Sequence, residues 1–204
     1  MSVQARARTR RQPRYSAEAR RTHLLDVAHD LCERHGTSGV TIERLAETAG
    51  VSRTLVYQHF TSSSDVLLRL LEREREWLQS DIDAGLARAS TFEEKLRAVI
   101  RPFLMARRER GASVLHTFLA ESSPDVVATA ASAWLERWGH FWVDEAVAAF
   151  GIDPDLAQDA VVIYRGAFFA TQRMVWRDQA DPKRLEDMLV TIVMSSLPAI
   201  SEAC

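Results

Sequence analysis

The sequence predicts an all-α protein with about nine helices, and three observations support this fold class. Apolar residues recur at three- and four-residue spacing along most of the chain. The dipeptides Asn-Gly and Asp-Gly, which commonly close β-hairpins, do not occur. Several segments open with a capping residue that precedes a proline or stands three residues before an acid, as helices do. We expect a small N-terminal domain of three helices followed by a larger helical domain.

The composition is that of an ordinary soluble protein. The chain has 204 residues, of which 47% are hydrophobic and 26% charged, and it contains no run of 18 apolar residues. The basic N-terminus lacks the apolar segment of a secretory signal. Cys32 and Cys204 lie too far apart to suggest a disulfide framework or a zinc site. We therefore expect a cytoplasmic protein without a membrane span, metal or cofactor.

Charge is distributed unevenly along the chain. Residues 1–64 contain ten arginines and six acidic residues, a net charge of +4, whereas the other 140 residues hold 16 basic and 22 acidic residues, a net charge of −6. A positive head on a negative body is expected when only the head meets phosphate. Residues 1–15 carry five of the arginines and are predicted to be a disordered basic arm. Such an arm can enter a minor groove, follow phosphates or simply keep the protein soluble.

The first predicted helix runs from near Ser16 to His35, and two short helices follow it within residues 41–60. Gly50 stands where a tight turn between helices needs a left-handed residue. Ser52 can then cap the next helix by accepting a hydrogen bond from a free backbone N–H. That helix buries Leu55 or Val56 and displays polar side chains on its other face. The pattern fits a helix-turn-helix that enters a DNA major groove, or a plain helical corner with a solvated face.

The segment from about residue 16 to 72 resembles the DNA-binding domain of the TetR family of transcriptional repressors. The matching residues are Gly39-Val40-Thr41, Leu45-Ala46, Ala49-Gly50-Val51-Ser52, Val56-Tyr57-Gln58-His59-Phe60 and Leu67-Leu68. The rest of the chain fits the family in length and helical layout. The resemblance implies a DNA-binding domain at 16–62 and a ligand-binding and dimerisation domain at 63–204. It further implies a ligand-responsive repressor that binds a pseudo-palindromic operator as a homodimer and is released by a small effector.

The family pattern assigns DNA contacts to eight residues of this sequence. They are Thr41, Ser52, Arg53, Thr54, Leu55, Tyr57, Gln58 and His59. Tyr57, His59 and Thr41 match positions that bind phosphates, whereas Arg53, Thr54 and Gln58 lie where side chains reach base edges. Leu55 touches a thymine methyl or simply packs. The family often has a lysine at the start of the next helix, but residues 60–63 here lack it, which implies a weaker salt dependence of DNA binding.

Capping patterns divide the rest of the chain into helices. Ser62 with Asp65 is predicted to open a long helix that in the family joins the two domains. Thr91 with Glu94 is a second capping box, and Ser123-Pro124, Asp153-Pro154 and Asp181-Pro182 each place a capping residue before a proline. These starts predict helices near 91–109, 112–122, 124–150, 154–178 and 182–199.

Large aromatic residues are frequent in the second predicted domain. Most such side chains form core, but some can line an apolar pocket of the kind that binds ligands between bundled helices. The candidate pocket residues are Phe103, His116, Phe118, Glu121, Trp134, Trp138, Phe141, Trp142, Phe169 and Gln172. This composition favours a lipophilic or planar aromatic effector over a sugar or a metal.

The last two predicted helices carry apolar residues on more than one face, which suits either a single-chain core or a four-helix bundle between two copies. We expect the homodimer, because one helix-turn-helix reads only half of an operator. No GxSxG, HExxH or phosphate-binding glycine loop is present, so an enzyme is not expected. The alternative is a helical ligand-binding or scaffold protein that has lost specific DNA binding. The missing lysine favours this alternative, whereas Arg53, Tyr57 and His59 oppose it.

Overall fold

A computed structural model describes residues 16–110, 117–118, 125–177 and 179–203. These residues form eight α-helices and one 3-10 helix, and no strand occurs among them, which confirms the predicted all-α class. The predicted basic arm at 1–15 and most of the predicted helix at 112–122 lie outside the described residues. None of the described helices is both long and apolar enough to cross a membrane.

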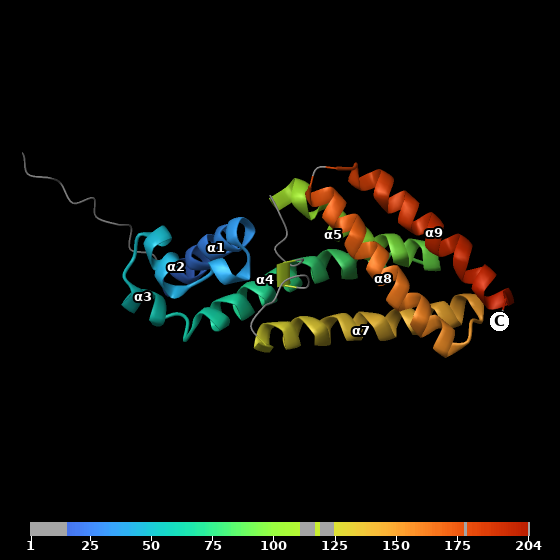
Figure 1. The fold of residues 1–204 in the computed structure, drawn as a ribbon, viewed down its shortest axis with the longest axis horizontal. Helices are drawn as coiled ribbons and strands as arrows, with labels where there is room; N and C mark the ends of the chain where they lie inside the picture. The colour runs from blue at the N-terminus through green and yellow to red at the C-terminus, as the bar shows by residue number, and fades with distance from the viewer. Residues whose placement is uncertain (1–15, 111–116, 119–124, 178, 204) are drawn as a thin grey trace, which may run out of the picture.

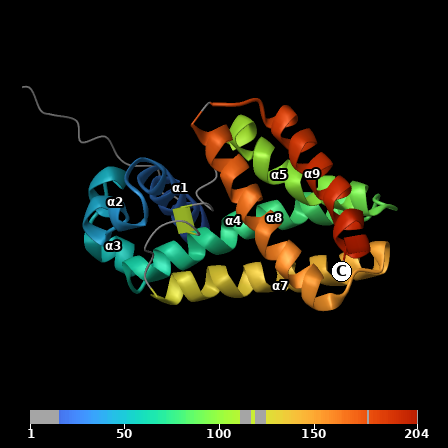
Figure 2. The ribbon, with the colours of Figure 1, turned by 45° about the vertical axis from the view of Figure 1, so that its right-hand side comes forward.

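The molecule is elongated, with a three-helix domain at one end and a helical body at the other (Figure 1). The small domain consists of α1 (Ala17–His35), α2 (Ile42–Ala49) and α3 (Arg53–Tyr57), with a short 3-10 helix, η1 (Thr37–Gly39), between the first two. Helix α4 (Ser63–Leu86) runs from this domain into the body, as both views of the ribbon show (Figures 1 and 2).

Local caps fix the ends of the first three helices. The Ser16 hydroxyl accepts a hydrogen bond from the Ala19 N–H at 3.1 Å, so α1 begins where the sequence predicts. Gly50 has φ 65° and ψ 35°, the left-handed conformation that the turn requires. The Val51 N–H donates to the Ala46 carbonyl at 2.9 Å, which closes α2 by a Schellman motif. The sharp turn between α2 and α3 is therefore encoded locally.

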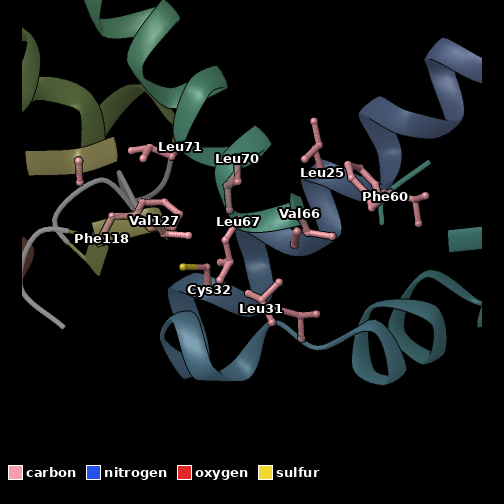
Figure 3. Packing of buried hydrophobic residues seen from close by; sticks show 14 of the residues in the cluster. Leu25, Leu31, Cys32, Phe60, Val66, Leu67, Leu70, Leu71, Phe118 and Val127 are labelled. Atoms are coloured by element: carbon pink, nitrogen blue, oxygen red, sulfur yellow. The ribbon is translucent and has the colours of Figure 1, made fainter. Parts of the chain in front are cut away.

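Helix α4 shares one apolar core with the small domain. Its fully buried Val66 and Leu70 pack in the same cluster as Leu25 and Leu31 of α1 (Figure 3). Arg73 of α4 adds polar links to α1, donating to the Asp26 carboxylate at 2.8 Å and to the Leu25 carbonyl at 3.3 Å. A displacement of α4 would therefore carry the small domain with it.

The body is formed by α5 (Phe92–Arg110), α7 (Asp125–Phe150), α8 (Pro154–Trp176) and α9 (Pro182–Ala203). The capping box at Thr91 forms as expected, because the Glu94 N–H donates to the Thr91 hydroxyl and the Thr91 N–H donates to the Glu94 carboxylate. Asp153 and Asp181 cap α8 and α9 through backbone N–H groups. The predicted cap at Ser123 lies outside the described residues.

A buried carboxylate holds α9 against α5. The side chain of Glu186 is 0% exposed and accepts hydrogen bonds from Arg101 at 2.8 Å and from Arg97 at 3.3 Å. Burial disfavours the charge of Arg97, but its hydrogen bonds to Asp187, Glu93 and Glu186 raise its pKa above the ordinary value. The hydrogen bond to Glu186 likewise raises the pKa of Arg101. Both guanidinium groups stay charged, so the carboxylate is neutralised within the fold.

Replacing Glu186 with alanine is expected to lower the free energy of unfolding by about 1–3 kcal/mol, because it removes the fully buried carboxylate that accepts hydrogen bonds from both Arg97 and Arg101. Urea unfolding followed by circular dichroism measures the change. Glu202→Ala, which removes an exposed glutamate from the same helix, should change stability by less than about 0.5 kcal/mol. Equal effects of the two substitutions would show that the buried carboxylate does not stabilise the α5–α9 contact.

Candidate nucleic-acid interface and apolar cavity

The outer face of α3 is polar and open to solvent. Arg53, Thr54 and Gln58 are exposed, and Tyr57 is 56% exposed although it is a large aromatic residue. Val56 is fully buried and Leu55 half-buried, so Val56 is the residue that anchors α3 to the core. These four side chains present hydrogen-bond donors and acceptors to solvent. This is the chemistry that base edges and phosphates require.

Arg53 forms an ion pair within the small domain. Its guanidinium lies 3.3 Å from the carboxylate of Glu43 on α2, and both side chains are more than half exposed. Such a surface ion pair contributes less than about 1 kcal/mol. It orients the arginine at the start of α3 and can be exchanged for a contact to DNA at small cost.

The remaining predicted DNA-contact residues have structural roles as well. The hydroxyls of Thr41 and Ser52 accept hydrogen bonds from the N–H groups of Arg44 and Leu55, each at 3.2 Å, and so cap α2 and α3. Each hydroxyl keeps its own hydrogen free to donate to a phosphate. His59 is half-buried beside the Phe60 ring, with the ring centroids 6.5 Å apart. All eight predicted residues thus lie on or beside α3 and the start of α2.

The segment that lacks the family lysine is occupied by a local hydrogen-bond network. The Ser62 hydroxyl accepts from the Asp65 N–H at 3.1 Å, whereas the Asp65 carboxylate accepts from the Thr61 N–H at 2.8 Å. The predicted capping box therefore forms with the acid reaching Thr61, one residue before Ser62. This carboxylate places negative charge where the family often has a cation.

A second feature is an apolar cavity of about 120 Å³ inside the body. It lies among α5, α7, α8 and α9, and its lining is almost entirely aromatic or aliphatic. Five of the ten predicted pocket residues line it, namely Phe103, Trp134, Trp138, Trp142 and Phe169. The pairs Trp134–Trp138 and Phe92–Trp142 meet edge to face, at interplanar angles of 82° and 71°. The walls are therefore ordered aromatic surfaces that suit a flat apolar molecule.

The other predicted pocket residues lie elsewhere. Phe118 is buried in the core that joins α1, α4 and α7, close to Val127 (Figure 3). Phe141 packs against Trp138 and Trp142 but does not line the cavity, and Gln172 is buried away from the cavity lining. His116 and Glu121 lie outside the described residues.

Sequence reasoning missed three notable lining residues: Gly139 of α7, and Tyr164 and Arg165 of α8. Tyr164 and Arg165 share a face of α8 with Val161, Phe168 and Phe169 at three- and four-residue spacing, a signal that could have revealed them. Gly139 carries no side chain and therefore gives no such signal.

Helices α8 and α9 also carry large apolar side chains on their outer surface. We call this surface the apolar strip, and it consists of Val162, Ile163, Met174, Met188 and Ile192. The opposite face of α9 is buried in the body through Leu185, Leu189 and Val193. Two faces of the same helix are thus apolar, as predicted, but the described residues cover only one of them.

One group of side chains could in principle ligate a cation. Among the described residues, His29, Asp30 and Glu33 of α1 bring potential ligand atoms within 4.8 Å of one another. Asp30 also pairs with Arg34 at 3.5 Å, so a cation would have to compete with the arginine for this carboxylate. Asp30 and Glu33 are exposed and His29 is half-buried, and we assign the group no metal.

Comparison with known proteins matches the small domain to one family and the whole chain to one fold. A family model described as "Bacterial regulatory proteins, tetR family" matches residues 24–70. The HTH-type transcriptional activator FasR from Mycolicibacterium smegmatis is 31% identical over 94 residues, which are 46% of this chain and 43% of FasR. The chain thus matches less than half of the length of this curated relative.

Two solved structures resemble the chain over most of its length. A TetR-like transcriptional regulator from Rhodococcus sp. RHA1 has a TM-score of 0.79 and 15% identity, and the match covers 90% of this chain and 98% of that one. The transcriptional regulator FadR from Bacillus subtilis, in complex with stearoyl-CoA, has a TM-score of 0.67 and 18% identity, with 84% and 96% covered. At these identities the likeness shows the fold alone.

Proposed function

Because the chain belongs to the TetR family of bacterial regulatory proteins, we propose that it is a transcriptional regulator that binds an operator as a homodimer and is released by a small apolar effector. The observation that carries this proposal is the uncovered polar face of α3, with Arg53, Tyr57 and Gln58 exposed on a helix whose Val56 is locked in the core. A rigidly held helix with free donors and acceptors is suited to reading a major groove.

DNA contacts divide into two kinds in this proposal. Arg53, Thr54 and Gln58 reach base edges and supply sequence preference. Tyr57, His59 and Thr41 bind phosphates and fix the position of α3 in the groove. The Asp65 carboxylate lies near the phosphates instead of a lysine, so the number of counterions released, and with it the salt dependence, is expected to be low for this class of protein.

The apolar strip of α8 and α9 supports a homodimer. Five large apolar side chains on two adjoining helices would be unfavourable in water, and a second copy related by a two-fold axis would cover them. Pairing α8 and α9 from each copy gives a four-helix bundle. The same symmetry places two α3 helices on the two halves of an inverted repeat.

The cavity supplies the proposed effector site. Its aromatic walls favour an apolar molecule, and FadR, which has the same fold, binds stearoyl-CoA. Trp134 of α7 lines the cavity and also lies under the Arg75 guanidinium of α4, 5.8 Å from ring centroid to Cζ. A ligand that shifts α7 would therefore displace α4 and the small domain that shares its core. The ligand must bind the DNA-incompetent arrangement more tightly than the competent one for this shift to release the operator.

Selection from fragmented genomic DNA with the purified full-length chain tests the proposal. We expect an enriched inverted repeat whose half-site centres are about one helical turn apart, or a multiple of it. Absence of any enriched sequence at low salt would instead support the alternative, a helical ligand-binding or scaffold protein without specific DNA binding. The absent lysine is the observation that favours this alternative, whereas the exposed Arg53 and Tyr57 oppose it.

A further inference from the structure

Among the described residues that line the cavity, Arg165 of α8 is the only charged one. The remaining lining residues are aliphatic or aromatic, apart from Gly139. The Tyr164 hydroxyl, the nearest polar group on the same helix, is hydrogen-bonded to the Ser196 hydroxyl of α9 at 2.7 Å. Arg165 therefore favours a negatively charged group on a ligand at this wall of the cavity.

Arg165 is half-buried and makes no hydrogen bond or ion pair with any other residue in the described parts of the chain. Other arginines of the body differ, since Arg97 and Arg101 are held by Glu186 and Asp187. An arginine at an apolar wall that pairs with none of the described residues adds little to the stability of this part of the fold. Its planar group of N–H donors matches the two oxygens of a carboxylate.

The size of the cavity limits the apolar part of a ligand. A volume of about 120 Å³ is close to the roughly 150 Å³ of an engineered apolar cavity that holds benzene. One aromatic ring fits this space, and a larger ring system would have to extend beyond it or move the walls. Trp134 and Trp138 pack edge to face, and the ring of a ligand could pack against them in the same geometry.

We propose that the effector is a compact aromatic carboxylate, with its ring in the cavity and its carboxylate paired with Arg165. This inference rests on the proposed effector role of the cavity and specifies the ligand's class. The ring contacts Trp138 and Trp142 of α7 while the carboxylate holds α8, so one small molecule links the helix that reaches α4 to a helix of the apolar strip.

Tryptophan fluorescence of the full chain, titrated with benzoate and with the neutral isostere benzamide, tests the proposal. Trp134, Trp138 and Trp142 line the cavity and report binding. We expect benzoate to bind about tenfold or more tightly than benzamide, because only benzoate can form a charge-assisted hydrogen bond with the half-buried Arg165. Arg165→Gln should abolish this preference. Arg173→Gln removes an exposed arginine of α8 outside the cavity lining and should leave the preference unchanged.

Equal affinities for the two probes, or a preference that survives Arg165→Gln, would overturn the assignment of Arg165 as the carboxylate partner. Binding of neither probe by a protein that still enriches an inverted repeat would overturn the ligand class and leave the regulator intact. Failure to enrich DNA, together with a benzoate preference that Arg165→Gln removes, would support the ligand assignment and reject the regulator.

Discussion

Arg53→Ala is expected to lower affinity for the operator by about thirtyfold or more and to relax base preference in each half-site. A side-chain contact to a base edge is worth about 1–3 kcal/mol, and a dimer loses the contact twice, so the total is about 2–6 kcal/mol. The fold should be unaffected, because Arg53 is exposed and its contact with Glu43 is a surface ion pair. The whole loss should therefore appear in DNA binding.

Fluorescence anisotropy with the enriched operator and with a scrambled duplex, at several salt concentrations, measures this effect. Arg34→Ala is the matched control, since Arg34 is also exposed and also paired, with Asp30 at 3.5 Å, but lies at the end of α1. Tyr57→Phe should weaken binding to both duplexes alike if its hydroxyl binds a phosphate. Equal losses for Arg53→Ala and Arg34→Ala would mean that charge alone holds the DNA and that α3 does not read it.

The turn and the helix starts at Ser16 and Ser52 in the small domain could be predicted because their signals are local. Ser16, Thr41 and Ser52 each accept a hydrogen bond from the backbone N–H three residues later. At the turn, the Gly50 N–H donates to the Glu47 carbonyl of the preceding helix. Such contacts depend on a few neighbouring residues, so a pattern in the sequence specifies them. The choice between Leu55 and Val56 was the exception, since it depends on what α1 and α2 place opposite α3.

The cavity could be predicted only in part, because a void is defined by the helices that surround it. Trp134 and Phe141 belong to one aromatic helix face in the sequence, yet only Trp134 lines the cavity. Phe118 is as apolar as Phe103 and belongs to the same core cluster, but only Phe103 lines the cavity. Periodicity identifies the buried face of a helix. The position of a cavity, by contrast, depends on how the side chains of four helices pack together.

Gly139→Leu is expected to abolish binding of benzoate and to raise the melting temperature. Gly139 is buried in the middle of α7 and lines the cavity, and a Cβ added there meets no other atom within 4 Å. The isobutyl group of leucine can therefore occupy the space proposed for the ligand ring. Stability should rise, because any non-proline side chain is better than glycine inside a helix, by up to about 1 kcal/mol, and because apolar surface is added to an apolar void.

Two further variants separate these contributions in thermal unfolding and fluorescence titration. Gly139→Ala and Gly166→Ala each add one methyl group to a helix at a site with no atom within 4 Å of the new Cβ, but Gly166 lies outside the cavity lining. Both should stabilise the helix, and only the change at Gly139 should weaken benzoate binding.

A Gly139→Leu protein that binds the operator normally and no longer responds to benzoate would place the effector in the cavity, since the substitution leaves α3 and the apolar strip untouched. Retained benzoate binding in a folded Gly139→Leu protein would exclude the cavity as the effector site. A loss of stability instead of a gain would mean that the cavity is closed in solution. A larger side chain destabilises the protein where neighbouring atoms already occupy the space that it needs.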